Sequence, residues 1–303
     1  MPSGILLLDK PRGLSSNAAL QRVKRAYGAA KAGHVGSLDP LATGMLPICL
    51  DEATKIAGEI LAGRKRYEFT VALGARTSTG DTEGEIVERS TVPLLGGARV
   101  AAVLAAFHGV QRQVPPMYSA LKRDGRPLYE LARAGIEVER PARDVTIHSL
   151  TLGELHAGTI DLITECSKGT YIRVLAEDLA RALGCVGHVS RLHRVWVEPF
   201  ENAPMLSLEV VLEGAGAGAP PPLLPIERGI PGWLAVSLSP TCVNRLRQGQ
   251  AIGRATVEGG REGAEGVLVA GMAVRLLDDA GRLIGLGEVD GFGGIRPRRI
   301  FNL

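Results

Sequence analysis

The sequence has no long uninterrupted hydrophobic run. An apolar stretch near the start, residues 5–8, is too short for the core of a signal peptide. Nothing in the 303 residues approaches the roughly 20 apolar residues of a membrane-spanning helix. These absences argue against an exported or membrane-embedded protein, so we expect a cytoplasmic protein with no membrane partner.

Cysteine is scarce and follows no pairing pattern. The chain has four cysteines, which lie far apart with no C-x-x-C motif: Cys49, Cys166, Cys185 and Cys242. Disulfide frameworks and zinc sites both depend on characteristic cysteine spacings. The sequence therefore indicates neither, and we expect reduced, mostly buried thiols.

The excess of positive charge is small. The formal net charge is +3, which by itself is too weak to argue for a nucleic-acid partner. The distribution is more informative, because basic residues gather in residues 1–50 and in clusters at 64–66, 122–126 and 296–299. Such clusters make phosphate binding plausible, although a solvated surface is the commoner explanation for any single cluster.

The order of predicted elements indicates two domains. The 303 residues, 45% of them hydrophobic, are enough to bury a core in each. Strand and helix patterns alternate up to about residue 200 without a regular strand–helix–strand repeat, which predicts an α+β fold with a mixed sheet and helices packed against it. Beyond residue 232 the pattern changes to short strands. We therefore predict a larger domain over residues 1–231 and a small β-rich domain over 232–303.

Two helix starts follow from capping residues. Ser15 is placed to cap a helix whose basic residues face outward. Asp51 is predicted to cap a second helix, which buries Ile60 and Leu61 and ends at Gly63.

Other elements follow from periodicity and composition. Residues 67–73 alternate between apolar and polar, which predicts a strand beginning at Tyr67. Residues 171–183 have helical spacing, with Gly184 as the stop. The Ala, Gly and Pro residues of 213–222 are low in complexity, and we expect them to form a loop or linker that does not pack.

Residues 33–47 form the most unusual stretch. Three glycines and two prolines disfavour a helix or a central strand and predict a loop, while its leucines indicate that the loop packs on a core. Asp39 is the only acid between Lys10 and Leu50. An Asp-Pro pair is ordinarily a turn initiator, but a rigid frame and a basic neighbourhood suit a carboxylate held ionised at one place. Asp39 is therefore a candidate catalytic residue.

Three further motifs accompany this stretch. They are Asp-Lys-Pro-Arg-Gly-Leu-Ser-Ser at 9–16, Lys-Arg-Tyr at 65–67 with Leu-Gly at 73–74, and Ser-Lys-Gly-Thr-Tyr-Ile-Arg at 167–173. In this order, the four stretches closely resemble the bacterial tRNA pseudouridine synthase B (TruB) family over nearly the whole chain. The C-terminal part resembles a PUA RNA-binding module.

The resemblance implies an activity and its partners. It implies a pseudouridine-synthase core and the isomerisation of uridine 55, in the T loop of tRNA, to pseudouridine after the base is flipped out. It also implies no cofactor, no metal and no obligatory protein partner, with the enzyme acting as a monomer on tRNA.

The resemblance also implies three catalytic residues. Asp39 would be the carboxylate, acting either as a nucleophile on carbon or as a base at the ribose C2′. Arg173 would pair with Asp39 and depress its pKa. Tyr67 would stack on the extruded uracil, although a ring at alternating spacing is otherwise read as core.

Four further residues match substrate-binding positions. His34 would fill the space left by the flipped base, Tyr171 and Leu192 would line the pocket, and Lys10 would support the active-site loop. Without the motifs, His34 and Lys10 would be read as surface residues and the other two as core. The chain departs from the family pattern at Val35, where threonine is usual.

Two alternatives stay open. A guide-RNA-dependent relative of the dyskerin type shares the catalytic core, although the bacterial-like insertion at about 108–150 argues against it. An RNA-binding protein that flips and refolds the tRNA elbow without chemistry belongs to a different class, and this role could coexist with catalysis.

Overall fold

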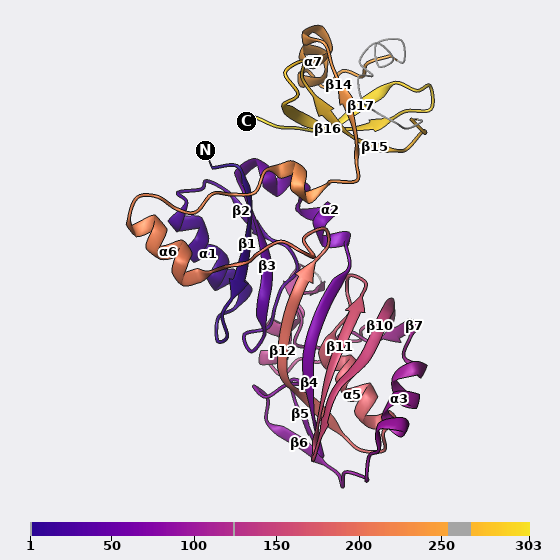
Figure 1. Cartoon of the computed structure of the whole chain (residues 1–303). Coiled ribbons are helices and arrows are strands. Elements are labelled where there is room, and N and C mark those ends of the chain that lie inside the picture. The colour runs from indigo at the N-terminus through magenta and orange to yellow at the C-terminus, as the bar shows by residue number, and fades with distance from the viewer. Residues whose placement is uncertain (1, 124, 254–267) are drawn as a thin grey trace.

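The computed structural model describes residues 2–123, 125–253 and 268–303. Figure 1 shows a long curved sheet with helices against it, and a smaller sheet at the C-terminal end of the chain. Within these ranges, no helix is both long and apolar enough to cross a membrane. The predicted α+β fold with a mixed sheet is confirmed.

The larger sheet has nine strands in the order β13-β1-β3-β12-β4-β11-β10-β7, with β2 paired to β3. β12 joins its two halves, because it runs parallel to β3 and antiparallel to β4. The strands are β1 Gly4–Lys10, β2 Ala32–His34, β3 Thr43–Leu50, β4 Lys65–Leu73, β7 Gly109–Gln113, β10 Arg143–His156, β11 Thr159–Cys166, β12 Gly187–Val197 and β13 Leu206–Ser207.

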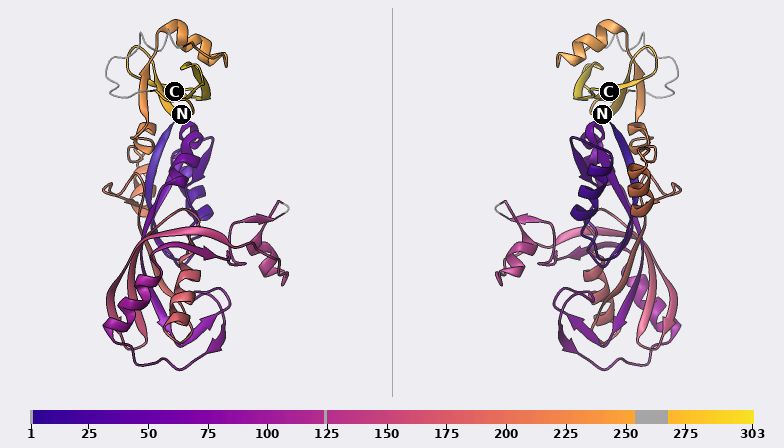
Figure 2. Two further views of the ribbon diagram at one scale, coloured as in Figure 1. Left: turned by 90° about the vertical axis from the view of Figure 1, so that its right-hand side faces the viewer. Right: turned by 90° about the vertical axis from the view of Figure 1, so that its left-hand side faces the viewer.

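Helices and short hairpins surround this sheet. The hairpin β8–β9 and helix α4 form an arm that projects from the body (Figure 2). The elements are α1 Ser16–Ala26, η1 Asp51–Ile56, α2 Ala57–Ala62, β5 Ala75–Thr77, β6 Ile86–Arg89, α3 Gly97–Ala106, β8 Lys122–Arg123, β9 Arg126–Pro127, α4 Leu128–Arg133, α5 Ile172–Ala182, α6 Leu208–Gly216 and η2 Ile226–Gly229.

The main core lies between the larger sheet and its helices. Along β4 buried and half-buried residues alternate, so that Tyr67, Phe69 and Val71 share the covered face. The same cluster includes Leu20 from α1 and Leu175 from α5. The core therefore fixes the strand that carries Tyr67 relative to both helices.

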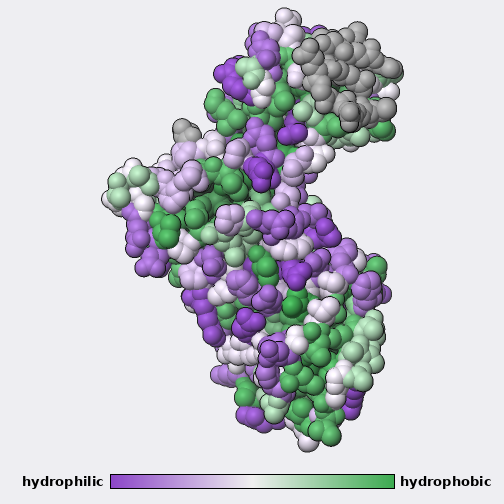
Figure 3. Space-filling model, in the orientation of Figure 1, coloured by the Kyte–Doolittle hydropathy of each residue, from purple (hydrophilic) through white to green (hydrophobic). Residues whose placement is uncertain are grey.

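The C-terminal sheet contacts the rest of the chain through a second apolar cluster. Leu283, Leu286 and Phe301 pack with residues of β1, β3 and η1. Lys55 Nζ also donates to the carbonyl oxygen of Ile300 at 2.7 Å, and Figure 3 shows hydrophilic residues on the surface near this junction. The sheet consists of β14 Leu234–Ser237, β15 Ala273–Leu277, β16 Leu283–Val289 and β17 Ile295–Ile300, and α7 Pro240–Arg247 packs beside it. A domain boundary at residue 231 stays a prediction.

Several local predictions are confirmed. The Ser15 side chain caps α1 by accepting from the N–H of Ala18 at 3.1 Å. The helix predicted over residues 171–183 is α5, and Gly184 follows it with φ +91°. All four cysteines are buried.

The prediction that residues 33–47 form one loop is wrong at both ends. β2 continues to His34 and β3 begins at Thr43, so the loop covers only residues 35–42. Gly44 lies inside β3 with φ +98°, where an added Cβ would come within 2.2 Å of the Arg194 carbonyl oxygen. Glycine at this position therefore lets β3 and β12 approach each other, whereas the sequence argument treated it as a strand breaker.

The predicted capping role of Asp51 is also wrong. Asp51 opens a 3-10 helix, and its carboxylate accepts from the N–H of Lys31 at 2.7 Å instead of capping its own helix. Ile60 is buried as predicted, but the Leu61 side chain is 44% exposed. The 3-10 turn that precedes α2 rotates the following residues relative to a continuous α-helix, because it has about 3.0 residues per turn instead of 3.6.

The stretch at 213–222 is only partly a loop. α6 continues to Gly216, with Leu208 and Val211 on its buried face, and it contacts α1. The Tyr27 hydroxyl donates to the carbonyl oxygen of Pro221 at 2.7 Å. The prediction that this stretch does not pack is therefore wrong, because the apolar face before it extends the helix into the low-complexity residues.

The core predicts a large effect for one buried leucine. Leu8 is fully buried in β1, and replacing it by alanine should lower the free energy of unfolding by about 2–5 kcal/mol because it leaves a cavity. Urea unfolding of Leu8→Ala measures this difference. Leu94→Ala is the control, because Leu94 is 97% exposed and should change stability by no more than about 0.5 kcal/mol. Equal effects of the two substitutions would contradict the described packing.

Candidate active site

Asp39 lies on a loop that several hydrogen bonds hold in place. Ser16 Oγ accepts from the N–H of Leu38 at 2.7 Å and donates to its carbonyl oxygen at 2.9 Å. The N–H of Gly13 donates to the carbonyl oxygen of Pro40 at 2.7 Å. Leu38 and Leu41 are buried on either side. The carboxylate therefore projects from a loop anchored to α1 and to the turn before it.

Arg173 binds this carboxylate with two of its nitrogens. Its Nε lies 2.9 Å from Asp39 Oδ2, and its Nη2 donates to Oδ1 at 3.1 Å. The guanidinium also donates to the carbonyl oxygens of Thr79 at 2.7 Å and Tyr118 at 2.6 Å. Because the Arg173 side chain is almost fully buried, these bonds fix the direction in which the carboxylate points.

Asp81 is a site residue that the sequence reasoning missed. Its Oδ2 lies 3.7 Å from Arg173 Nε, and the residue is buried. Its other oxygen accepts from Thr79 Oγ1 at 2.6 Å and from the N–H of Glu83 at 3.0 Å. The sequence around Asp81 is polar, and no spacing pattern links Asp81 to Asp39. Arg173 therefore faces two carboxylates, of which Asp81 is buried and Asp39 is partly exposed.

The pKa of Asp39 is raised above its ordinary value. Partial burial is the main cause, the Arg173 guanidinium opposes it, and the charge of Asp81 adds to it. The expectation that Arg173 lowers the pKa of Asp39 is confirmed for the contribution of Arg173, but it does not give the net direction. It left out desolvation and Asp81, neither of which the sequence motifs reveal. About a third of the side chain, 35%, stays exposed and can meet a ligand.

Tyr67 and Leu192 lie together on the covered face of the sheet. In the pairing of β12 with β4, Leu192 is opposite Phe69 and Arg194 is opposite Tyr67. Tyr67 and Leu192 are both buried in the main core. Burial raises the pKa of Tyr67, Arg194 lowers it, and the charge of Asp39 raises it further. The ring is therefore within electrostatic reach of the carboxylate.

Lys10 is completely buried below the loop. Its Nζ donates to the carbonyl oxygens of Leu14 at 2.7 Å and Pro11 at 2.9 Å, and reaches that of Pro40 at 3.5 Å. Burial lowers its pKa to about 8, while Asp39 raises it. Lys10 is therefore not the surface residue that a lysine in a turn would ordinarily be. Its contact with Pro40 connects it to the loop of Asp39.

His34 is the last residue of β2, and Tyr171 is the residue directly before α5. Burial and the charge of Arg194 lower the pKa of His34, whose Nδ1 has no hydrogen-bond partner among the described residues. The N–H of Tyr171 donates to the side chain of Gln113 at 3.0 Å. Burial raises the pKa of Tyr171, and Asp39 contributes to this rise.

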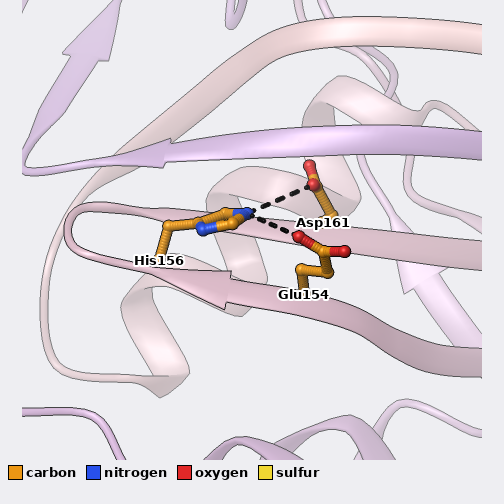
Figure 4. Close-up of side chains that lie close together, drawn as sticks. All are labelled: Glu154, His156 and Asp161. Atoms are coloured by element: carbon orange, nitrogen blue, oxygen red, sulfur yellow. Dashed lines mark ion pairs between the residues drawn. The ribbon is translucent and has the colours of Figure 1, made fainter.

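One group of metal-type donors appears in the described ranges, and it lies on the β10–β11 hairpin. Figure 4 shows the carboxylates of Glu154 and Asp161 beside the imidazole ring of His156. His156 Nε2 is 3.2 Å from Glu154 and 3.8 Å from Asp161. The Glu154 and His156 side chains are more than half exposed, and neither Asp39 nor Arg173 belongs to the group. These three side chains therefore form a surface cluster that is separate from the candidate site.

Family models match most of the chain. "TruB family pseudouridylate synthase (N terminal domain)" matches residues 24–172, "tRNA pseudouridylate synthase B C-terminal domain" matches 173–218, and "Pseudouridine synthase II TruB, C-terminal" matches 235–301. These matches cover both the candidate site and the C-terminal sheet.

Curated relatives resemble the chain over nearly its full length. The tRNA pseudouridine synthase B of Nitrosococcus oceani is 48% identical over 98% of this chain and 94% of its own. That of Xanthomonas campestris pv. campestris is 45% identical over 99% of this chain and 94% of its own.

Solved structures share the fold at low identity. A chain of a Cbf5-Nop10-Gar1 complex aligns with a TM-score of 0.72 at 22% identity, over 96% of this chain and 80% of that one. A chain of an H/ACA RNP bound to a substrate RNA aligns with a TM-score of 0.73 at 20% identity, over 100% of this chain and 86% of that one. These structures show the fold. The family models and the curated relatives lead to one conclusion: the chain belongs to the TruB family of pseudouridylate synthases.

Proposed function

We propose that this chain isomerises uridine 55, in the T loop of tRNA, to pseudouridine, with Asp39 as the catalytic carboxylate. The observation that carries the proposal is the carboxylate of Asp39, partly exposed on an anchored loop and held at both oxygens by Arg173. Relatives named tRNA pseudouridine synthase B, similar over nearly the whole chain, support the choice of substrate.

The reaction exchanges one glycosidic bond for another. The bond from uracil N1 to the ribose C1′ breaks, the ring turns while still held, and C5 bonds to C1′. C5 then loses its proton and N1 gains one, so that no net atom is lost. Asp39 in its ionised form either attacks carbon or removes a proton from C2′. Water must stay out during this exchange, and the buried walls of Tyr67 and Leu192 serve that purpose.

Arg173 and Asp81 keep the carboxylate in a reactive orientation. Arg173 is bonded to two carbonyl oxygens as well as to Asp39, so it cannot follow the carboxylate if that group moves. The negative carboxylate of Asp81 also lies near the Arg173 guanidinium and offsets part of its positive charge. In our proposal Arg173 thereby directs Asp39 without neutralising it fully.

The uracil is bound after it leaves the base stack. Flipping costs a few kcal/mol, and stacking on Tyr67 returns about 1–3 kcal/mol. Tyr171 and Leu192 line the same pocket in this proposal. His34 projects from β2, the strand directly before the loop of Asp39, and takes the place of the flipped base. Lys10 supports the loop through Pro40.

The C-terminal residues 232–303 are proposed to be a PUA-like RNA-binding domain. Arg296 and Arg299 are exposed on β17, and neither forms an ion pair with a described carboxylate. A basic surface of this kind suits the phosphate backbone of tRNA. We further propose that the chain works in the cytoplasm as a monomer on tRNA alone, with neither a guide RNA nor a protein partner.

The dependence on Asp39 is tested with tRNA that carries 5-tritiated uridine. The unmodified chain should release tritium without added metal or guide RNA, and Asp39→Asn should release none because the amide cannot act as nucleophile or base. Asp279→Asn is the matched control, since Asp279 lies in an exposed turn of the C-terminal sheet, and it should keep full activity. Equal release by Asp39→Asn would remove Asp39 from the chemistry, and no release by the unmodified chain would favour a guide-dependent or chaperone role.

The raised pKa of Asp39 predicts how the rate depends on pH. Because the ionised form reacts, the single-turnover rate should fall as the pH is lowered through the raised pKa. This acid limb should lie above the ordinary value of 3.8. The measurement is the single-turnover rate against pH. Asp81→Asn removes a charge that raises this pKa, so it should move the limb to lower pH. A limb that stays in place would contradict the described electrostatics.

Binding of the RNA should depend strongly on salt. Phosphate contacts release counterions, so the affinity for an isolated T stem-loop should fall steadily as the salt concentration rises. Fluorescence anisotropy with Asp39→Asn measures this binding without turnover. A response that is flat from low to physiological salt would count against the basic surfaces as the RNA-binding footprint.

A further inference from the structure

Arg194 has an unusual environment for a charged residue. It is the largest fully buried side chain in the described part of the protein, with 1% of its surface exposed. No described carboxylate lies within ion-pair distance of it. A buried guanidinium must then be satisfied by other acceptors.

Backbone carbonyl groups supply these acceptors. Nε donates to the carbonyl oxygen of Met45 at 2.7 Å, and Nη2 donates to that of Gly36 at 2.9 Å and approaches that of Val35 at 3.4 Å. Val35 and Gly36 precede Asp39, whereas Met45 follows it in β3. The guanidinium therefore links the two ends of the loop that carries the catalytic carboxylate.

The contact with Val35 compensates for a missing donor. The N–H of Val35 donates to the carbonyl oxygen of Pro47 at 2.9 Å, continuing the pairing of β2 with β3. In a regular antiparallel pair the residue at position 47 would return a bond to Val35. Proline has no N–H, so Arg194 Nη2 is the donor near this oxygen.

Two glycines of the loop region allow Arg194 to fit. Gly36 has φ +72°, and a Cβ there would lie 3.1 Å from Arg194 Nη1. At Gly44 a Cβ would collide with the carbonyl oxygen of Arg194 itself. The close approach of Arg194 thus accounts for glycine at both positions.

Arg194 is also placed beside Tyr67, on the neighbouring strand. It lies opposite Tyr67 in the pairing of β12 with β4. Its charge lowers the pKa of Tyr67 against the effect of burial, and it also lowers the pKa of His34. The Arg194 side chain therefore bonds to both ends of the Asp39 loop, and the residue lies opposite Tyr67 on the neighbouring strand.

We propose that Arg194 is a positioning residue that sets the Asp39 loop relative to Tyr67, acting through the carbonyl groups of Val35, Gly36 and Met45. The inference rests on the proposed isomerisation of uridine. Arg194 does not touch the reacting atoms in this proposal. Lysine would keep the charge, but it lacks the planar fork that serves several carbonyl groups at once.

Arg194→Lys separates positioning from RNA binding. It should bind T stem-loop RNA with an affinity within about twofold of the unmodified chain, while its single-turnover rate falls by about 100-fold, as expected for a misplacement of about 1 Å. Arg191→Lys is the matched control on the same strand, because the Arg191 side chain is 57% exposed, and it should leave the rate unchanged. Loss of activity in the unmodified chain would sink the proposed function, whereas full activity in Arg194→Lys would sink only this inference.

A readout without activity follows the ring of Tyr67. The chain has five tyrosines, so its 19F NMR spectrum with 3-fluorotyrosine can be assigned with Tyr67→Phe. Arg194→Lys should shift the Tyr67 signal and leave the signal of Tyr129, on α4, in place. An unmoved Tyr67 signal, or a loss of RNA affinity as large as the loss of rate, overturns the inference. If thermal unfolding shows that Arg194→Lys is not folded, Arg194→Gln is measured instead. If neither variant folds, Arg194 is required for the fold itself and the inference is overturned.

Discussion

The two-pronged contact between Arg173 and Asp39 is the interaction on which the rest of the site depends. It joins the start of α5 to the loop between β2 and β3, which are far apart in the sequence. Such a contact fixes direction as well as charge, because the guanidinium fork matches both carboxylate oxygens. The carbonyl groups of Thr79 and Tyr118 hold the fork from behind. The carboxylate is thus left with one defined orientation and a partly exposed surface for a ligand.

Three buried cations surround this centre, and each is satisfied differently. Arg173 pairs with carboxylates, whereas Lys10 and Arg194 are satisfied by backbone carbonyl groups around the same loop. Burying them costs hydration, which their hydrogen bonds must offset. Burial and the charge of Asp81 raise the pKa of Asp39, whereas Arg173 and Lys10 lower it, and the net effect is a raised pKa. In our account Asp39 reacts in its ionised form, so this balance decides the pH below which the reaction slows.

The sequence predicted the α+β class, most elements and the pairing of Asp39 with Arg173, because periodicity, capping and a long family motif are local signals. It failed where long-range packing decides. Gly44 and Pro47 look like strand breakers until β12 is placed beside β3 and Arg194 beside Val35. The sequence around Asp81 and Arg194 does not indicate their roles. An acid in a polar loop, such as Asp81, and a charged strand residue, such as Arg194, are ordinarily solvated. The net pKa direction of Asp39 likewise depends on burial that no motif records.

The most direct test of the central claim is the single-turnover rate of Arg173→Lys on tRNA, measured together with its affinity. Lysine keeps the positive charge but can reach only one carboxylate oxygen at a time. The account predicts a large loss of rate with nearly unchanged tRNA affinity, because the orientation of Asp39 is lost while the RNA-binding surface remains. A rate equal to that of the unmodified chain would show that charge alone suffices and would contradict the account.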